Sequence, residues 1–250
     1  MRKKLIIIGI ATIVAMRLVA QTVTPNLING VFIIDKTNHY SITSNANSND
    51  NDDNDENGLI TGYGAAAYFT YTPGLTIPTT AFSKAGNVKF NNEPLHYDNV
   101  KKFYSETEDD DDNFTEQHWK VSGHDAIPNM NFLYNGAFPS FTINQSMVSN
   151  TLKKSDTLFI TINNIQHADS IRININDNNN ATNKHYIALQ APNYSNKYYL
   201  TPSMFSPLLV GTNAVVKIEA INYNYQTVAG KKYLFRNMFS FVKAGITIIN

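Results

Sequence analysis

The chain has 250 residues, of which 20 are basic and 20 acidic, so its formal net charge is zero, and it contains no cysteine. The lack of cysteine excludes disulfide-stapled mini-proteins, cysteine-ligated zinc and a thiol nucleophile. A neutral chain also argues against a dedicated nucleic-acid-binding protein, because such proteins usually carry a strong basic excess. The length suits one large or two ordinary domains, and hydrophobic residues, at 42%, are frequent enough to form a core.

Residues 1–20 have the pattern of an export signal. Three basic residues at positions 2–4 precede the apolar run Leu5–Met16, and Ala20 offers a small residue before a cleavage point. The run is shorter than the roughly 20 residues that span a bilayer, so we expect a cleaved signal rather than a membrane anchor. No cysteine follows it, which rules out a lipoprotein. Cleavage would leave 16 basic and 20 acidic residues, a net charge of −4, on a secreted or cell-surface protein.

The first half of the mature chain contains short apolar runs separated by long polar stretches. Strands are expected at Val31–Asp35, Ala65–Tyr71, Asn87–Phe90, Trp119–Val121 and Ser140–Ile143. The stretches Asn45–Gly58 and Glu106–Asn113 have almost no apolar residues to bury, so we expect them to form loops.

The second half shows a clear alternation with period two. In Ser170–Asn176 the three isoleucines at positions 171, 173 and 175 would share one face of a strand. A similar run covers Leu158–Asn163, and the short connector between the two predicts an antiparallel pair. Further strands are expected at Ala214–Asn222, Tyr233–Val242 and Ile246–Ile249. No long stretch has a helical period.

These patterns predict an all-β protein with two β-sandwich domains, at residues 21–145 and 146–250, because strands recur regularly in the second half. Leu208–Asn222 reads as a leucine, a glycine turn and an alternating strand that ends in Ala-x-Asn. It resembles the late hairpin of fibronectin type III-like domains, although Ala214 or Val215 stands where that family usually has tyrosine. The resemblance implies an Ig-like second domain and implies nothing about a ligand.

A second resemblance extends over more of the chain. Its elements are the signal, Ala65–Ala67, Ala85–Asn91, Trp119–Gly123, and the proline-containing pieces Ile127–Pro128 and Phe138–Phe141. Together they are similar to secreted proteins of Bacteroidetes-type bacteria, most of which have no assigned activity. This resemblance implies a cell-envelope or extracellular location and carries over no catalytic residue.

The acidic stretches suggest a possible calcium site. The segment from residue 53 to 58 matches the opening of a calcium loop, D-x-D-x-N-G, with Asp53, Asp55 and Asn57 as candidate ligands. Asp109 and Asp111 in the second acidic run could share the ion. However, glycine stands at position 64, where the closing bidentate glutamate should be. We therefore favour solvated loops, keep calcium as a possible ligand, and expect no other cofactor.

Aromatic residues provide the candidate ligand-binding groups. The tyrosines of the second half lie in polar surroundings, and tyrosine with asparagine suits stacking and hydrogen bonding to sugars or peptides. The candidates are Tyr194, Tyr198, Tyr199, Tyr223 and Tyr225. The alternative, which we favour, is that they line strand edges and rims. Trp119 alternates with Val121 and is expected in the core, although an exposed tryptophan could stack on a sugar.

No catalytic signature stands out. Ser122, His124 and Asp125 are adjacent, whereas the members of a triad converge in space from distant positions, and no G-x-S-x-G elbow is present. We therefore expect no enzyme. The leading hypothesis is a non-catalytic binding or adhesion-type protein for an extracellular protein or a glycan, with no membrane segment after signal cleavage. The alternatives are a carbohydrate-binding module and a secreted hydrolase.

Overall fold

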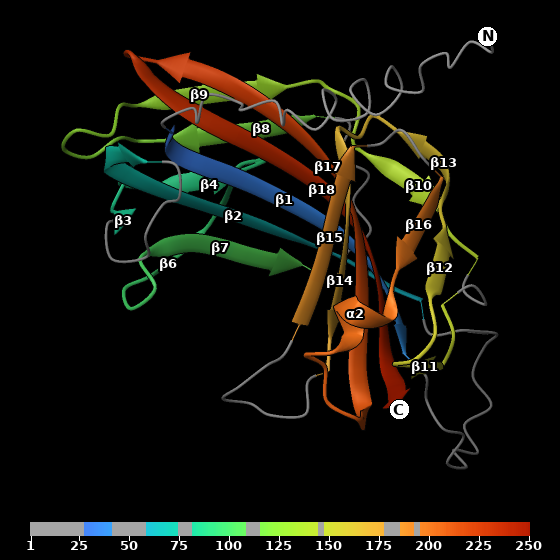
Figure 1. The fold of residues 1–250 in the computed structure, drawn as a ribbon. Coiled ribbons are helices and arrows are strands. Elements are labelled where there is room, and N and C mark those ends of the chain that lie inside the picture. Colours follow the sequence, from blue (N-terminus) through green and yellow to red (C-terminus); the bar gives the residue numbers. More distant parts are fainter. Residues whose placement is uncertain are drawn as a thin grey trace, which may run out of the picture.

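The computed structural model describes residues 28–41, 59–74, 82–108, 116–144, 148–177, 186–192 and 196–250. These residues form an almost entirely β structure, which confirms the predicted all-β class (Figure 1). The strands are β1 (Ile28–Ser41), β2 (Leu59–Gly74), β3 (Phe82–Ser83), β4 (Val88–Phe90), β5 (Glu93–Pro94), β6 (His96–Asp98), β7 (Phe103–Glu108), β8 (Gln117–Val121), β9 (Met130–Tyr134), β10 (Ser140–Thr142), β11 (Thr151–Lys153), β12 (Leu158–Thr161), β13 (Asn163–Gln166), β14 (Ser170–Asn176), β15 (Tyr186–Pro192), β16 (Lys197–Leu200), β17 (Gly211–Val228) and β18 (Lys231–Ile249). The helix α2 is a single turn, Pro202–Phe205. No helix among the described residues is both long enough and apolar enough to cross a bilayer.

One ten-stranded sheet forms the centre of the structure. Its strands follow the order β15-β14-β17-β18-β1-β2-β7-β6, while β11 pairs with β18 and β3 pairs with β2. The pairing is antiparallel except where β1 and β11 lie parallel to β18. Smaller sheets are formed by β10 with β13, by β12 with β16, and by the four strands β5-β4-β8-β9.

The hairpin of β17 and β18 is the longest feature of the main sheet. The two strands contain 18 and 19 residues, and only Ala229 and Gly230 join them, with Val228 paired to Lys231. Both turn residues have positive φ, 49° and 74°, as a type I′ hairpin turn requires. In Figure 1 the hairpin runs from the end of the molecule near β9 to the end that carries α2 and the C-terminus.

Two apolar clusters pack on the same face of this hairpin. Alternate residues of β18 share one face, and Tyr233 and Phe235 enter the first cluster, while Phe241 enters the second. In the first cluster, the ring of Phe32 on β1 stacks on Phe235 with centroids 4.6 Å apart. The ring centres of Trp119 on β8 and Phe32 are 4.9 Å apart, and Trp119 is only 1% exposed. The prediction that Trp119 lies in the core is therefore confirmed.

The second cluster contains the alternating isoleucines of the predicted strand at residues 170–176. Ile171, Ile173 and Ile175 of β14 are all fully buried, as their spacing predicted. They pack with inward residues of β17, such as Val216 and Ile218, and with side chains from β12 and β16. The sheet of β12 and β16 therefore covers this part of the main sheet (Figure 1).

The main sheet contains strands from both sides of the predicted boundary between residues 145 and 146. Strands β1, β2 and β7 precede this position and pair in the same sheet as β14, β17 and β18, which follow it. Because β18 contributes side chains to both clusters, the two halves of the chain share a structural element. Strands from both halves of the chain, which the sequence analysis assigned to two separate sandwiches, therefore pair in one sheet.

The predicted pairing of residues 158–163 with residues 170–176 is wrong. Strand β12 pairs with β16, and β14 pairs with β15 and β17. The connecting residues form β13, which pairs with β10. Positive φ values at Asn164 and His167, 50° and 53°, redirect the chain between the sheets. Alternation fixes which side chains are buried, but it does not determine which strand lies alongside.

Replacing Phe32 by alanine tests the first cluster. Phe32 is almost fully buried and contacts the rings of Phe235 and Trp119. The cavity should lower the free energy of unfolding by about 3–5 kcal/mol, as measured by urea denaturation. Phe159→Ala is the control, because Phe159 is 59% exposed and surface truncations usually cost about 0.5 kcal/mol or less. Equal losses in the two variants would contradict this packing.

Candidate functional site

The candidate tyrosines of β16 point to opposite sides of their sheet. Tyr198 is 3% exposed and lies in the second apolar cluster, where burial raises the pKa of its hydroxyl. Tyr199 is 52% exposed and contacts Phe159 of β12, which is 59% exposed, edge to face with ring centroids 5.3 Å apart. Only one of the two tyrosines is therefore available to a ligand at the surface.

The other candidate tyrosines do not join this pair in one sheet. Tyr223 and Tyr225 lie two residues apart on β17 and so share a face of the main sheet, and the ammonium of Lys232 lies 4.6 Å from the Tyr225 ring centre. Tyr194 lies outside the described residues. The structure thus distributes the four described tyrosines over two sheets and does not assemble them into one platform.

The candidate calcium ligands Asp53, Asp55, Asn57, Asp109 and Asp111 all lie outside the described residues. Within the described ranges, no three His, Cys, Asp or Glu side chains form a group that could hold a metal ion.

The triad-like residues after β8 have other partners. The hydroxyl oxygen of Ser122 accepts a hydrogen bond of 2.7 Å from the backbone amide of Asn87. In the exposed turn that follows, Nδ1 of His124 lies 3.1 Å from a carboxylate oxygen of Asp125. The serine is engaged by a backbone amide and the histidine by its own neighbour, which is not the arrangement of a catalytic triad.

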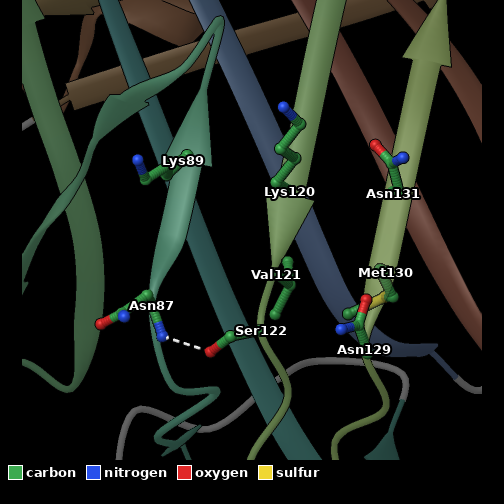
Figure 2. A pocket seen from close by; sticks show the side chains of 8 residues that line it. All are labelled: Asn87, Lys89, Lys120, Val121, Ser122, Asn129, Met130 and Asn131. Carbon is green, nitrogen blue, oxygen red and sulfur yellow. Dashed lines mark hydrogen bonds between the residues drawn. The ribbon is translucent and has the colours of Figure 1, made fainter.

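The outer surface of the four-stranded sheet, which we call the β4–β8–β9 face, contains a depression with polar side chains around it and Val121 and Met130 in its lining. Strand β8 buries Gln117, Trp119 and Val121 and directs His118 and Lys120 away from the core. Figure 2 shows the side chains that surround a pocket of about 340 Å³ on this face. The lining residues are Asn87, Lys89, Lys120, Val121, Ser122, Asn129, Met130 and Asn131.

The lower edge of this pocket is fixed by contacts with the main sheet. The hydroxyl of Tyr104 on β7 accepts a hydrogen bond from the Ala85 amide and donates one to the Gly86 carbonyl, both 2.8 Å long. Gly86 has φ +80°, and a Cβ there would collide with the Ser122 hydroxyl and the following carbonyl. Glycine therefore allows the start of β4 to approach the end of β8, and Asn87 follows at the rim.

The side chains of the β4–β8–β9 face offer amides and cations. Lys89 and Lys120 are direct register partners on β4 and β8. The Lys120 ammonium donates to Oδ1 of Asn92 over 2.9 Å, and His118 shares a 2.5 Å hydrogen bond with Oδ1 of Asn131. Amides donate and accept hydrogen bonds, while the ammonium groups attract anions, so this face suits a ligand with hydroxyl and anionic groups.

Sequence reasoning placed β4 and β8 in strands but did not single out this face. The alternation within each strand could have predicted that Lys89 and Lys120 point outward, on the face of the sheet away from the buried Phe90 and Trp119. The register that sets the two lysines side by side comes from pairing across 31 residues of chain and could not be obtained from the alternation.

A second charged cluster lies on the face of the main sheet that is opposite to the apolar clusters. Glu219 of β17 is 2% exposed and accepts hydrogen bonds from Arg172 and, over 2.8 Å, from Asn174 of β14. The Lys217 ammonium lies 3.1 Å from a carboxylate oxygen of Glu219 and 2.7 Å from a carboxylate oxygen of Asp35 on β1, so it bridges the two acids. These charges are paired and link three strands of the sheet, which indicates a structural role.

Burial within this cluster opposes the ionisation of Glu219. The hydrogen bond from Arg172 and the charge of Lys217 outweigh that effect and hold the pKa of Glu219 below its ordinary value of 4.5. For Lys217, burial also opposes the charge, but Asp35 and Glu219 outweigh it and raise its pKa. Glu219 and Lys217 are therefore both charged at neutral pH.

Comparison with known protein families and with curated proteins finds no match for this chain. The function must therefore be argued from the surfaces themselves.

Replacing Glu219 by glutamine tests the charged cluster. The variant should lose about 2 kcal/mol of stability at pH 7, because two partly exposed cations lose their buried carboxylate. The lowered pKa means that the contribution of Glu219 is present above its unfolded pKa and is lost as pH falls through the folded pKa. The difference between wild type and variant should therefore shrink below about pH 4.5.

Thermal unfolding from pH 3 to pH 8 measures this difference. Glu93→Gln serves as the control, since Glu93 is exposed on β5 and should leave stability nearly unchanged at every pH. A difference between wild type and Glu219→Gln that persists undiminished at pH 3 would contradict the assigned ion pairs.

Proposed function

We propose that this chain is a secreted or cell-surface, non-catalytic binding protein of the adhesion type, with the β4–β8–β9 face as its ligand-binding surface. The observation that carries the proposal is the pocket in that face, in which amide and ammonium groups from three adjacent strands surround one depression. Side chains on paired strands are held in fixed relative positions, which lowers the entropic cost of binding.

The anchoring of this face supports the proposal. The sheet of β4, β8 and β9 rests on the main sheet through Trp119 and Phe32, and the Tyr104 hydroxyl holds the chain just before β4. Lys89, Asn129 and Asn131 are exposed and do not pack in the core beneath them. Polar side chains on a rigidly held sheet are suited to binding a ligand.

An extracellular location is supported by the sequence. Residues 1–20, which lie outside the described residues, have the charge and hydropathy pattern of an export signal. The likeness of several segments to secreted Bacteroidetes-type proteins, and of Leu208–Asn222 to fibronectin type III-like domains, agrees with a role at the cell surface.

A carbohydrate-binding module is the second candidate, and one observation favours it. Phe159 and Tyr199 expose an aromatic pair on the outer side of β12 and β16, and exposed aromatic rings can pack on the apolar faces of sugars. The ligands of the main proposal include both proteins and glycans, so the two candidates are distinguished by which surface the binding depends on.

The export signal gives a direct prediction. Expressed with its own first 20 residues in a bacterial host, the protein should leave the cytoplasm and begin at Gln21, because the small residue Ala20 precedes the cleavage point. Intact-mass measurement of the exported protein checks this. Deletion of the apolar run Leu5–Met16 should leave the precursor in the cytoplasm. Recovery of exported protein that still carries residues 1–20 would contradict cleavage.

The binding surface is tested with the mature protein on arrays of glycans and extracellular proteins. Asn129→Ala and Asn131→Ala remove amides from the β4–β8–β9 face and should weaken binding of any ligand found by about fivefold or more, because each loses hydrogen bonds to it. The matched control is Asn213→Ala, an exposed position on β17. Binding that is insensitive to Asn129 and Asn131 but lost in Phe159→Ala and Tyr199→Ala would favour the second candidate.

A further inference from the structure

Lys89 and Lys120 are an unusual pair of residues on the β4–β8–β9 face. The two residues are directly opposite each other in an antiparallel ladder. In such a pair the Cβ atoms are about 4.5–5.5 Å apart, and like charges destabilise the ladder. Figure 2 shows both side chains on the same side of the sheet, on neighbouring strands. Like charges held on directly opposite residues repel, and an anion bound between or above the lysines would relieve that repulsion.

No carboxylate relieves this repulsion within the described part of the chain. The ion pairs found there involve other cations, and Lys120 donates instead to the neutral amide oxygen of Asn92. Lys217 in the main sheet gives the contrast, because it contacts both Asp35 and Glu219. Among the described residues, Lys217 is therefore paired with acids, whereas Lys89 and Lys120 are not.

The surrounding groups narrow the chemistry of the anion. The amides of Asn87, Asn129 and Asn131 lie around the lysines and can hydrogen-bond with hydroxyl groups. None of the described residues that line the pocket is an arginine, the residue that recognises phosphate with two parallel hydrogen bonds. A ligand rich in hydroxyl groups and carrying spaced carboxylates or sulfates satisfies both the amides and the ammonium groups.

We infer that the β4–β8–β9 face binds an acidic polysaccharide, with Lys89 and Lys120 contacting its carboxylate or sulfate groups and the asparagines contacting its hydroxyls. This inference rests on the proposed function and names its ligand class. The overall charge of the mature chain is negative, so attraction of a polyanion depends on this local pair.

The experiment measures binding of the mature protein to polygalacturonate, chondroitin sulfate and the neutral polymer dextran by isothermal titration calorimetry. We expect binding to one or both acidic polymers, weakened by added salt, and none to dextran. Lys89→Gln with Lys120→Gln should reduce the affinity about tenfold or more, as the loss of charge-assisted hydrogen bonds predicts. The matched control, Lys101→Gln with Lys153→Gln, removes the same charge from exposed positions elsewhere and should stay within about twofold.

Thermal unfolding of the lysine variant provides a second readout. Removing the repulsion should leave the melting temperature of Lys89→Gln/Lys120→Gln unchanged or higher than that of wild type. A clear drop would show that the two ammonium groups already stabilise the fold through contacts within this chain, and would overturn the inference.

Further outcomes separate the inference from the proposed function. Equal loss of affinity in both double variants would show attraction by overall charge alone and would overturn the inference. Equal binding of single-stranded DNA, a polyanion without sugar carboxylates, would do the same. If a neutral glycan or a protein binds instead, and this binding depends on Asn129 and Asn131, the inference of an acidic ligand is overturned while the proposed function stands.

Discussion

The register of the β17–β18 hairpin is the constraint on which the rest of the structure depends. A two-residue turn, Ala229–Gly230, fixes the pairing of two strands of 18 and 19 residues. This register aligns the inward residues of both strands, so Phe241 lies among the isoleucines of the second cluster and Phe235 lies against Phe32 in the first. A slip of one residue would turn every one of these side chains to the opposite face.

The candidate surface follows from this hairpin through a chain of contacts. On the side away from β17, β18 pairs with β1, and β1 is followed in the sheet by β2 and β7. Phe32 of β1 then supports Trp119 of the second layer, while Tyr104 of β7 fixes the backbone just before β4. Strands β4, β8 and β9 are thereby held as a firm base, and the lysines and asparagines on their outer side belong to no core.

The two polar clusters differ in how their charges are compensated, and this difference indicates their roles. On the main sheet, Arg172 and Lys217 meet Glu219, whose pKa is lowered by them. On the β4–β8–β9 face, Lys89 and Lys120 lie side by side without such a partner in the described residues. Internal pairing stabilises a fold, whereas a pair of like charges with no counter-ion among the described residues costs stability, and the proposed anionic ligand would offset that cost.

The sequence alone determined the all-β class, the burial of Trp119 and the inward face of Ile171, Ile173 and Ile175, because period-two alternation depends only on local backbone geometry. It did not determine the partners of residues 158–163, the sharing of β18 by both clusters, or the separation of the tyrosines between two sheets. Strand pairing joins residues far apart in the chain, and the alternation is the same whichever strand lies alongside. Only the tertiary structure could therefore bring Lys89 next to Lys120 and gather the asparagines around them.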